Sequence, residues 1–219
     1  MNIDYFKLVS APHVLIAGAT GSGKSTMIHG IINEILKQGG CVGLIDPKRV
    51  ELSPYKHIAK FYAVEVDSIK RWLDGVIQTM EDRYTYMEKH GLRDKCPYQH
   101  LFVIIDELAD LMIQDKKGIS ARLQRITQLG RACNIHLIAA TQAPDRTYTL
   151  PAPLKLNFTD RVALRCSDTI ESKQIIGQKG AEDLPRYGFC IWKSPMEIDT
   201  FSVPYISNND IAQTVKMYS

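Results

Sequence analysis

The sequence predicts an α/β fold, a mainly parallel sheet flanked by helices on both faces. Short β-rich runs alternate along the chain with segments whose apolar residues recur at helical spacing, and this alternation is typical of such a sheet. The chain has 219 residues, 45% hydrophobic and 23% charged, which is an average soluble composition and excludes a disordered or fibrous protein.

Seven segments are expected to be strands. They are residues 14–18, 41–46, 61–66, 101–106, 135–141, 160–166 and 188–192. Between the first two, Ile28, Ile31, Ile32 and Ile35 repeat at helical spacing, and the pattern stops at two glycines, 39 and 40. This stretch predicts one complete βαβ unit.

Three further segments complete the expected organisation. Residues 67–90 carry an apolar stripe that includes Trp72, and Asp67 or Ser68 is the expected N-cap. Residues 116–131 predict a helix with basic and no acidic side chains, which suits either a solvated face or a phosphate partner. Residues 143–159 are proline-rich without periodicity and predict a long loop.

The composition also indicates which partners, metal sites and cellular compartment to expect. The net charge of +3 neither requires nor excludes a nucleic acid. The five cysteines form no CxxC pair and the six histidines show no paired ligand spacing, so we expect reduced cysteines and no histidine metal site. The longest apolar stretches are too short to span a bilayer and the first ten residues do not resemble a secretory signal, so we expect a cytoplasmic protein.

The motif with the clearest chemistry is GATGSGKS at residues 18–25, which fits GxxxxGK[ST] and lies between an apolar strand and an amphipathic helix. In such a loop, inward-facing N–H groups and the helix N-terminus bind phosphates, a lysine reaches the β- and γ-phosphates, and a serine offers its hydroxyl to Mg²⁺. A glycine turn without a ligand is the alternative. The residues expected to bind nucleotide here are Gly18, Ala19, Thr20, Gly21, Ser22, Gly23, Lys24, Ser25 and Thr26.

Two carboxylates follow the apolar run at 101–105, at the strand end where parallel sheets bind ligands. Asp106 is expected on the Mg²⁺ side together with Ser25, and Glu107 is expected to orient or deprotonate the attacking water. The alternative is that one of them merely caps the next helix. Gln142, beside Thr141 at another strand tip, is expected to sense the γ-phosphate or simply to end the strand.

The motifs that are missing narrow the class of nucleotide-binding protein. The sequence has no NKxD guanine-reading motif and no LSGGQ-like stretch, which disfavours a GTPase and a transporter ATPase. The remaining class is the RecA-like motor ATPases, P-loop NTPases that hydrolyse ATP.

Taken together, these motifs resemble those of the FtsK/SpoIIIE family of DNA-pumping ATPases. The resemblance rests on five segments that cover essentially the whole chain in the family's order. They are PHVLIAGATGSGKS, LIDPKRVELSPY, VIIDELADLM, GRACNIHLIAATQAP and QIIGQKGAEDLPRYG.

The resemblance implies a RecA-like motor that assembles, typically as a hexameric ring, around double-stranded DNA, with ATP sites between subunits. It assigns Lys24 and Glu107 to catalysis and Arg131 to a trans-acting arginine finger, for which a local surface ion pair is the alternative. It also places Lys155 in a loop that faces the pore, and Arg146 is a nearby second candidate for DNA contact.

The chain departs from the family pattern at two places that concern DNA. Ala143 stands where many relatives carry arginine, and residues 167–169 are Ser-Asp-Thr where relatives often have a lysine. Residues 1–219 are expected to be a single motor domain, with the membrane, linker and winged-helix regions of larger relatives absent. A separate membrane or DNA-recognition protein is then a possible partner.

The sequence therefore predicts an ATP- and Mg²⁺-dependent double-stranded DNA translocase. Two alternatives stay open. One is an ATPase of the same superfamily in a protein secretion or conjugative transfer system, and the other is a nucleotide-dependent assembly module with low turnover.

Overall fold

The computed structural model describes residues 5–93, 95–142 and 150–219. They form one eight-stranded sheet in the order β3-β2-β4-β5-β1-β6-β7-β8. The strands are β1 His13–Ala17, β2 Cys41–Ile45, β3 Phe61–Ala63, β4 Leu101–Ile105, β5 Ile135–Thr141, β6 Asp160–Leu164, β7 Phe189–Lys193 and β8 Ile198–Ser202. Strands β1 to β6 run parallel to one another, whereas β7 is antiparallel to both β6 and β8.

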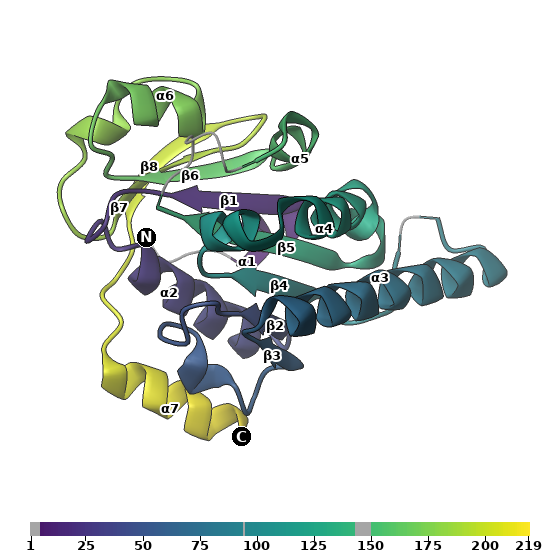
Figure 1. Ribbon diagram of the computed structural model, residues 1–219. Coiled ribbons are helices and arrows are strands. Elements are labelled where there is room, and N and C mark those ends of the chain that lie inside the picture. Colours follow the sequence, from purple (N-terminus) through teal and green to yellow (C-terminus); the bar gives the residue numbers. More distant parts are fainter. Residues whose placement is uncertain (1–4, 94, 143–149) are drawn as a thin grey trace.

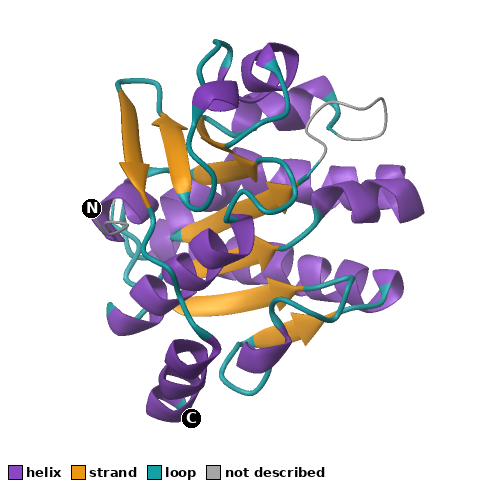
Figure 2. Cartoon of the chain, turned by 90° about the vertical axis from the view of Figure 1, so that its left-hand side faces the viewer, coloured by secondary structure: helices purple, strands orange, loops and turns teal. Residues whose placement is uncertain are grey.

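Helices cover both faces of this sheet, as the sequence predicts. They are α1 Tyr5–Ser10, α2 Lys24–Lys37, α3 Val66–Lys89, α4 Leu108–Leu129, α5 Ala152–Asn157, α6 Thr169–Ile176 and α7 Asn208–Tyr218, with short 3₁₀ turns η1 Ser53–Tyr55, η2 Gly130–Cys133 and η3 Ala181–Asp183. Figure 1 shows α3 and α4 lying alongside each other, and Figure 2 shows α7 at the lower end of the molecule beside the C-terminus.

Strand residues alternate between two apolar cores because successive side chains of a strand point to opposite faces. Val14 and Ile16 of β1 belong to a core cluster that also contains the buried side of α2 and Ile211 of α7. Leu15, between them, packs with α3, α4 and α5 instead. A third, smaller cluster joins α6 and η3 to β6 and β7. The sheet is therefore covered on both faces near the strand ends that carry the predicted site.

Several expected boundaries were wrong. The strand at 61 ends at Ala63, and α3 begins at Val66 with Glu65 as its N-cap, rather than Asp67 or Ser68. Trp72 does not join the buried stripe: it is 42% exposed and stacks on Phe61 with 4.8 Å between ring centroids. Inside the predicted loop 143–159, residues 152–157 form the short helix α5.

The basic helix proved to be the second part of α4, which begins at Leu108 and is kinked at Asp115. Its arginines face acidic residues of α3, because Arg122 pairs with Asp74 at 2.8 Å and Arg125 with Glu81 at 2.8 Å. The charge run therefore includes a set of surface ion pairs between two helices. The part of the chain that the structure describes contains no helix long and apolar enough to cross a membrane.

Candidate nucleotide-binding site

The GATGSGKS loop joins β1 to α2 and owes its shape to its glycines. Gly21 and Gly23 have φ angles of 75° and 100°, in the left-handed region that favours glycine. A Cβ on Gly23 would lie 2.5 Å from the backbone nitrogen of Gly188, so no other residue fits there without displacing the backbone. Gly23 is also the N-cap of α2 and has no side chain with which to cap it. The helix N-terminus is thus left to other acceptors, such as phosphate oxygens.

Neighbouring segments hold this loop in place. The N–H of Ala19 donates to the carbonyl of Arg165 at 2.9 Å, and the N–H of Gly188 donates to the carbonyl of Ser22 at 2.9 Å. A Cβ on Gly18 would lie 2.8 Å from the Cβ of Leu164, so β6 packs directly against the start of the loop. These contacts pre-form the loop before any ligand arrives.

Lys24 points from the first turn of α2 toward the tip of β4. Its side chain is buried, 7% exposed, and its Nζ lies 3.4 Å from the carbonyl oxygen of Asp106 and 3.4 Å from Oε2 of Glu107. The structure therefore brings together the lysine of the first motif and the carboxylate of the second, which are 83 residues apart in the chain.

Glu107 is 2% exposed and is held from three sides. Besides Lys24, the N–H of Gln142 donates to its two oxygens at 3.2 and 3.3 Å, and Nζ of Lys48 lies 3.7 Å from Oε2. Glu107 occupies the N-cap position of α4 but makes no side-chain cap hydrogen bond. The alternative that this carboxylate merely caps the helix is therefore wrong.

Asp106 is 3% exposed, and its Oδ1 is buried with no hydrogen-bond partner among the described residues. Burial raises the pKa of its carboxyl to about 6, against the opposing charge of Lys24. A free, buried carboxylate oxygen fits a hard cation such as Mg²⁺, which completes its coordination with water and phosphate oxygens rather than with a full protein cage. The described ranges contain no group of three or more His, Cys, Asp or Glu side chains that could together hold a metal ion.

The tip of β5 also faces the loop. The hydroxyl of Thr20 donates to Oε1 of Gln142 at 3.0 Å, so the strand tip and the phosphate loop are in direct contact. Gln142 thus touches the loop through its side chain and Glu107 through its backbone. The tip of β5 is therefore connected both to the phosphate loop and to the acidic tip of β4.

A cavity of about 360 Å³ opens beside the loop. Residues 19–22 form one wall, and Arg165, Cys166, Ser167, Arg186 and Tyr187 form the others. Tyr187 is 73% exposed and has a φ angle of 68°, an uncommon conformation for a bulky residue. Space for the rest of a nucleotide therefore adjoins the phosphate loop.

The sequence of this chain matches a known protein family. Residues 2–100 and 93–146 match the FtsK/SpoIIIE family, so the match covers more than half of the chain. The chain belongs to the FtsK/SpoIIIE family.

Two curated relatives illustrate the membership. The DNA translocase FtsK of Chlorobaculum tepidum is 34% identical over 93% of this chain, and the DNA translocase SftA of Bacillus subtilis is 39% identical over 81% of it. This chain spans only 29% and 21% of the length of those two proteins.

Among solved structures, the pCW3 conjugation coupling protein TcpA in its monomer form with ATPγS has a similar fold. It is 25% identical, with a TM-score of 0.85 over 97% of this chain and 66% of that one.

Not every site residue expected for a FtsK/SpoIIIE protein lies near the loop. Arg131 is exposed in η2, just before β5 begins, whereas the phosphate loop follows the end of the parallel neighbour β1. The five-residue length of β1, roughly 16 Å, therefore separates Arg131 from the loop of its own chain. Lys155 is half-buried on α5, which packs against α4, and Arg146 lies outside the described residues.

Sequence reasoning gave no role to the turn after β2. Asp46, at the tip of that strand, is fully buried, and its Oδ1 has no partner in the described part of the chain. Lys48, two residues on, contacts Glu107. The DPK motif after a buried strand was the available signal, because its strand ends at the same edge of the sheet as β4.

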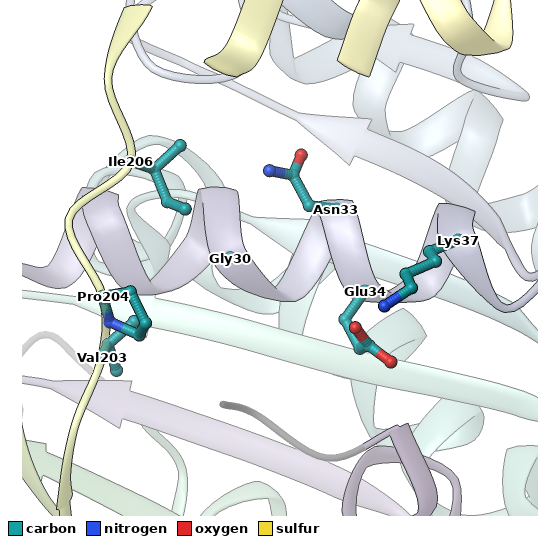
Figure 3. Close-up of a pocket in the computed structure, with 7 residues that line it drawn as sticks. All are labelled: Gly30, Asn33, Glu34, Lys37, Val203, Pro204 and Ile206. Carbon is teal, nitrogen blue, oxygen red and sulfur yellow. The ribbon is translucent and has the colours of Figure 1, made fainter. Parts of the chain in front are cut away.

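A second cavity of about 200 Å³ lies on α2, away from this site. Figure 3 shows the segment from Val203 to Ile206 passing beside α2 near Gly30, while Asn33 and Lys37 project from later turns. None of its lining residues belongs to the phosphate loop.

Proposed function

We propose that the chain is an ATP-hydrolysing motor that moves double-stranded DNA as a member of an oligomeric ring. The observation that carries the proposal is the meeting of Lys24, Asp106 and Glu107 beside a loop already shaped for phosphates. Support also comes from the two relatives, both named DNA translocases.

In this proposal the triphosphate lies along the loop from Gly18 to Thr26, with the ribose and base toward the cavity beside Tyr187. Lys24 turns from Glu107 to the β- and γ-phosphates and neutralises charge on the transferring group. Glu107 orients the attacking water and accepts its proton, while Gln142 contacts the γ-phosphate. Burial of Lys24 and Glu107 strengthens these interactions, because charges act over a lower effective dielectric away from water.

Ser25 and Asp106 are the residues that would hold Mg²⁺. The unpartnered Oδ1 of Asp106 supports this assignment, as does the half-buried position of Ser25 in the first turn of α2. When bound, the ion supplies positive charge to the phosphate oxygens.

Arg131 acts in trans in this account. It lies at the opposite end of the strands from its own phosphate loop, beside a cavity of about 400 Å³ that Lys7 and Asp160 also line. An arginine in that position can reach only the nucleotide of a neighbouring subunit, which couples hydrolysis to ring assembly. A hexamer is the ring size we propose.

Contacts with DNA are proposed for Lys155 and Arg146. They would be to phosphates, hence indifferent to sequence and weakened by salt. The proposal places the motor in the cytoplasm, where ATP and DNA are both present, working with a separate membrane or DNA-recognition protein.

The proposal is tested by the ATP hydrolysis rate measured against duplex length and salt concentration. We expect duplex DNA to stimulate hydrolysis, longer duplexes to act more strongly, and added salt to remove the effect. Lys24→Ala and Arg131→Ala should each abolish hydrolysis, and a mixture of the two variants should recover part of it if Arg131 acts in trans.

Other outcomes separate the alternatives. Stimulation by a peptide but not by duplex DNA would indicate a protein secretion ATPase. Tight ATP binding without turnover at high protein concentration would indicate an assembly module. Hydrolysis that is unchanged in both variants would reject the assigned roles.

A further inference from the structure

Lys48 contacts the buried carboxylate of the site although it lies on a different strand tip from every predicted catalytic residue. Its Nζ is 3.7 Å from Oε2 of Glu107 and 3.5 Å from Oδ2 of Asp110. The two carboxylates lie at the N-cap and in the first turn of α4, so one ammonium group ties the start of that helix to the end of β2.

The turn that carries Lys48 is built to hold one shape. Asp46 accepts at Oδ2 from the N–H of Leu52 at 3.1 Å and from the hydroxyl of Tyr62 at 3.2 Å. The N–H of Arg49 donates to the carbonyl of Asp46 at 3.1 Å, and Leu52 is fully buried. Both ends of the turn are therefore fixed, and the side chain of Lys48 starts from a defined position.

Without a ligand, two lysines share one oxygen of Glu107. Lys24 Nζ is 3.4 Å from Oε2 and Lys48 Nζ is 3.7 Å from the same atom. A triphosphate carries more negative charge than a carboxylate and lies where Lys24 can reach it, so Lys24 leaves Glu107 when nucleotide binds. Lys48 is then the remaining cation on Glu107.

We propose that Lys48 is a positioning residue that holds the carboxylate of Glu107 aimed at the attacking water once Lys24 has moved to the phosphates. The inference rests on the proposed ATPase function. It assigns Lys48 no contact with ATP, because Asp110 holds its ammonium group on the α4 side of Glu107.

Steady-state hydrolysis and equilibrium ATP binding test the proposal together. We expect Lys48→Met to lower turnover by about tenfold or more, the scale seen when an outer partner that orients a functional group is removed. ATP affinity should stay at the wild-type level, and Lys48→Arg should restore most of the rate. Arg49→Ala, a neighbouring cation that pairs with the exposed Glu65, is the matched control and should leave turnover unchanged.

Two kinetic outcomes overturn the inference. Wild-type turnover in Lys48→Met shows that Glu107 needs no second cation. A loss of ATP affinity that accounts for the whole loss of rate shows that Lys48 binds the nucleotide instead.

A second measurement judges the contact without relying on turnover. The urea midpoints of Lys48→Met, Glu107→Gln and the variant that carries both changes form a double-mutant cycle. We expect the effects of the two substitutions on stability to be non-additive, because the two residues interact. Additive effects would overturn the proposal. If the wild-type chain hydrolyses no ATP, the proposed function fails by itself, while the cycle still decides whether Lys48 acts on Glu107.

Discussion

Asp106 carries a stability cost that follows from its burial. It is 3% exposed, its Oδ1 has no partner in the described ranges, and burial raises its pKa from 3.8 to about 6. An acid with a raised pKa in the folded state makes the free energy of unfolding fall as the pH rises from 3.8 to about 6. At neutral pH the full penalty is present, because the native chain then holds a charge that its surroundings disfavour.

Asp106→Asn should therefore raise the free energy of unfolding of the ligand-free chain at neutral pH by roughly 1–3 kcal/mol. The same change should weaken Mg²⁺-dependent nucleotide binding. Urea denaturation measures the first effect, with Asp67→Asn, whose side chain is 82% exposed, as a control that changes little. A ligand-free Asp106→Asn chain less stable than wild type would contradict this account.

The two left-handed glycines of the phosphate loop provide a matched pair. Both positions disfavour any residue with a Cβ, at a cost of roughly 1–2 kcal/mol. Only Gly23 also faces a clash, since its Cβ would lie 2.5 Å from the backbone nitrogen of Gly188, whereas a Cβ on Gly21 meets nothing within 4 Å. We expect Gly23→Ala to be less stable than Gly21→Ala by at least about 1 kcal/mol in urea denaturation without nucleotide. Equal losses would show that the loop yields more easily than its contacts suggest.

At the scale of elements, α4 is two helices joined at Asp115. The backbone of Asp115 is non-helical, with φ −151° and ψ 76°. Its Oδ1 accepts from the N–H of Gly118 at 2.8 Å, which is the contact of an N-cap, and its Oδ2 accepts from Lys70 of α3 at 3.2 Å. One carboxylate therefore starts the second half of α4 and ties it to α3.

Asp115→Ala removes both contacts and should lower the thermal and urea midpoints. Asp115→Asn keeps the cap acceptor and should retain most of the stability. Circular dichroism during unfolding measures both variants. No loss in the alanine variant would mean that the kink is held by packing alone.

Elements with a strong hydrophobic pattern could be predicted from the sequence, and β8 and α5, which lack such a pattern, could not. The apolar runs before Gly18 and Asp106 predicted buried strands correctly because both of their faces lie under helices. Strand β8 was missed because IDTFS lies at the sheet edge, where its side chains are exposed or half-buried and no apolar run is required. Helix α5 was missed because six residues that include a proline carry no periodic signal. The kink at Asp115 has no signal beyond a residue type that also occurs on helix surfaces.

The candidate site shows the same division. The phosphate loop and the acidic tip were predicted because each is a local motif beside a recognisable strand. The contact of Lys48 with Glu107 depends on β2 lying next to β4, and strand order is a property of the whole sheet. A single sequence does not specify that order residue by residue.

At the scale of the whole molecule, two buried histidines, His13 and His136, and the half-buried His100 lie at the end of the sheet opposite the phosphate loop. His136 donates from Nδ1 to the carbonyl of Ala11 at 3.3 Å, so its Nε2 accepts from Nδ1 of His100 at 2.9 Å. His13 accepts at Nδ1 from the N–H of Leu137 at 3.0 Å. These contacts fit neutral rings, and burial lowers the pKa of His13 to about 3 and that of His136 to about 4.

A histidine whose pKa is lowered in the folded state contributes its full stability above pH 6.5, the ordinary pKa of the unfolded side chain. This contribution to the free energy of unfolding is lost as the pH falls. We expect the free energy of unfolding to decrease from about pH 6.5 to pH 4, because the unfolded chain binds protons there that the native rings exclude. Asp106 acts in the opposite direction in this range, so its asparagine variant should show a steeper decrease. Urea titrations across this range measure the slope, and His136→Gln should flatten it. A stability that does not change over this range would contradict the buried neutral rings.

The most direct test of the whole account is ATP binding and duplex-stimulated turnover in Glu107→Gln beside wild type. If the loop holds the phosphates and Glu107 activates the water, the variant binds ATP as tightly as wild type while its turnover falls by about a hundredfold or more. Turnover at the wild-type rate in Glu107→Gln would contradict the account.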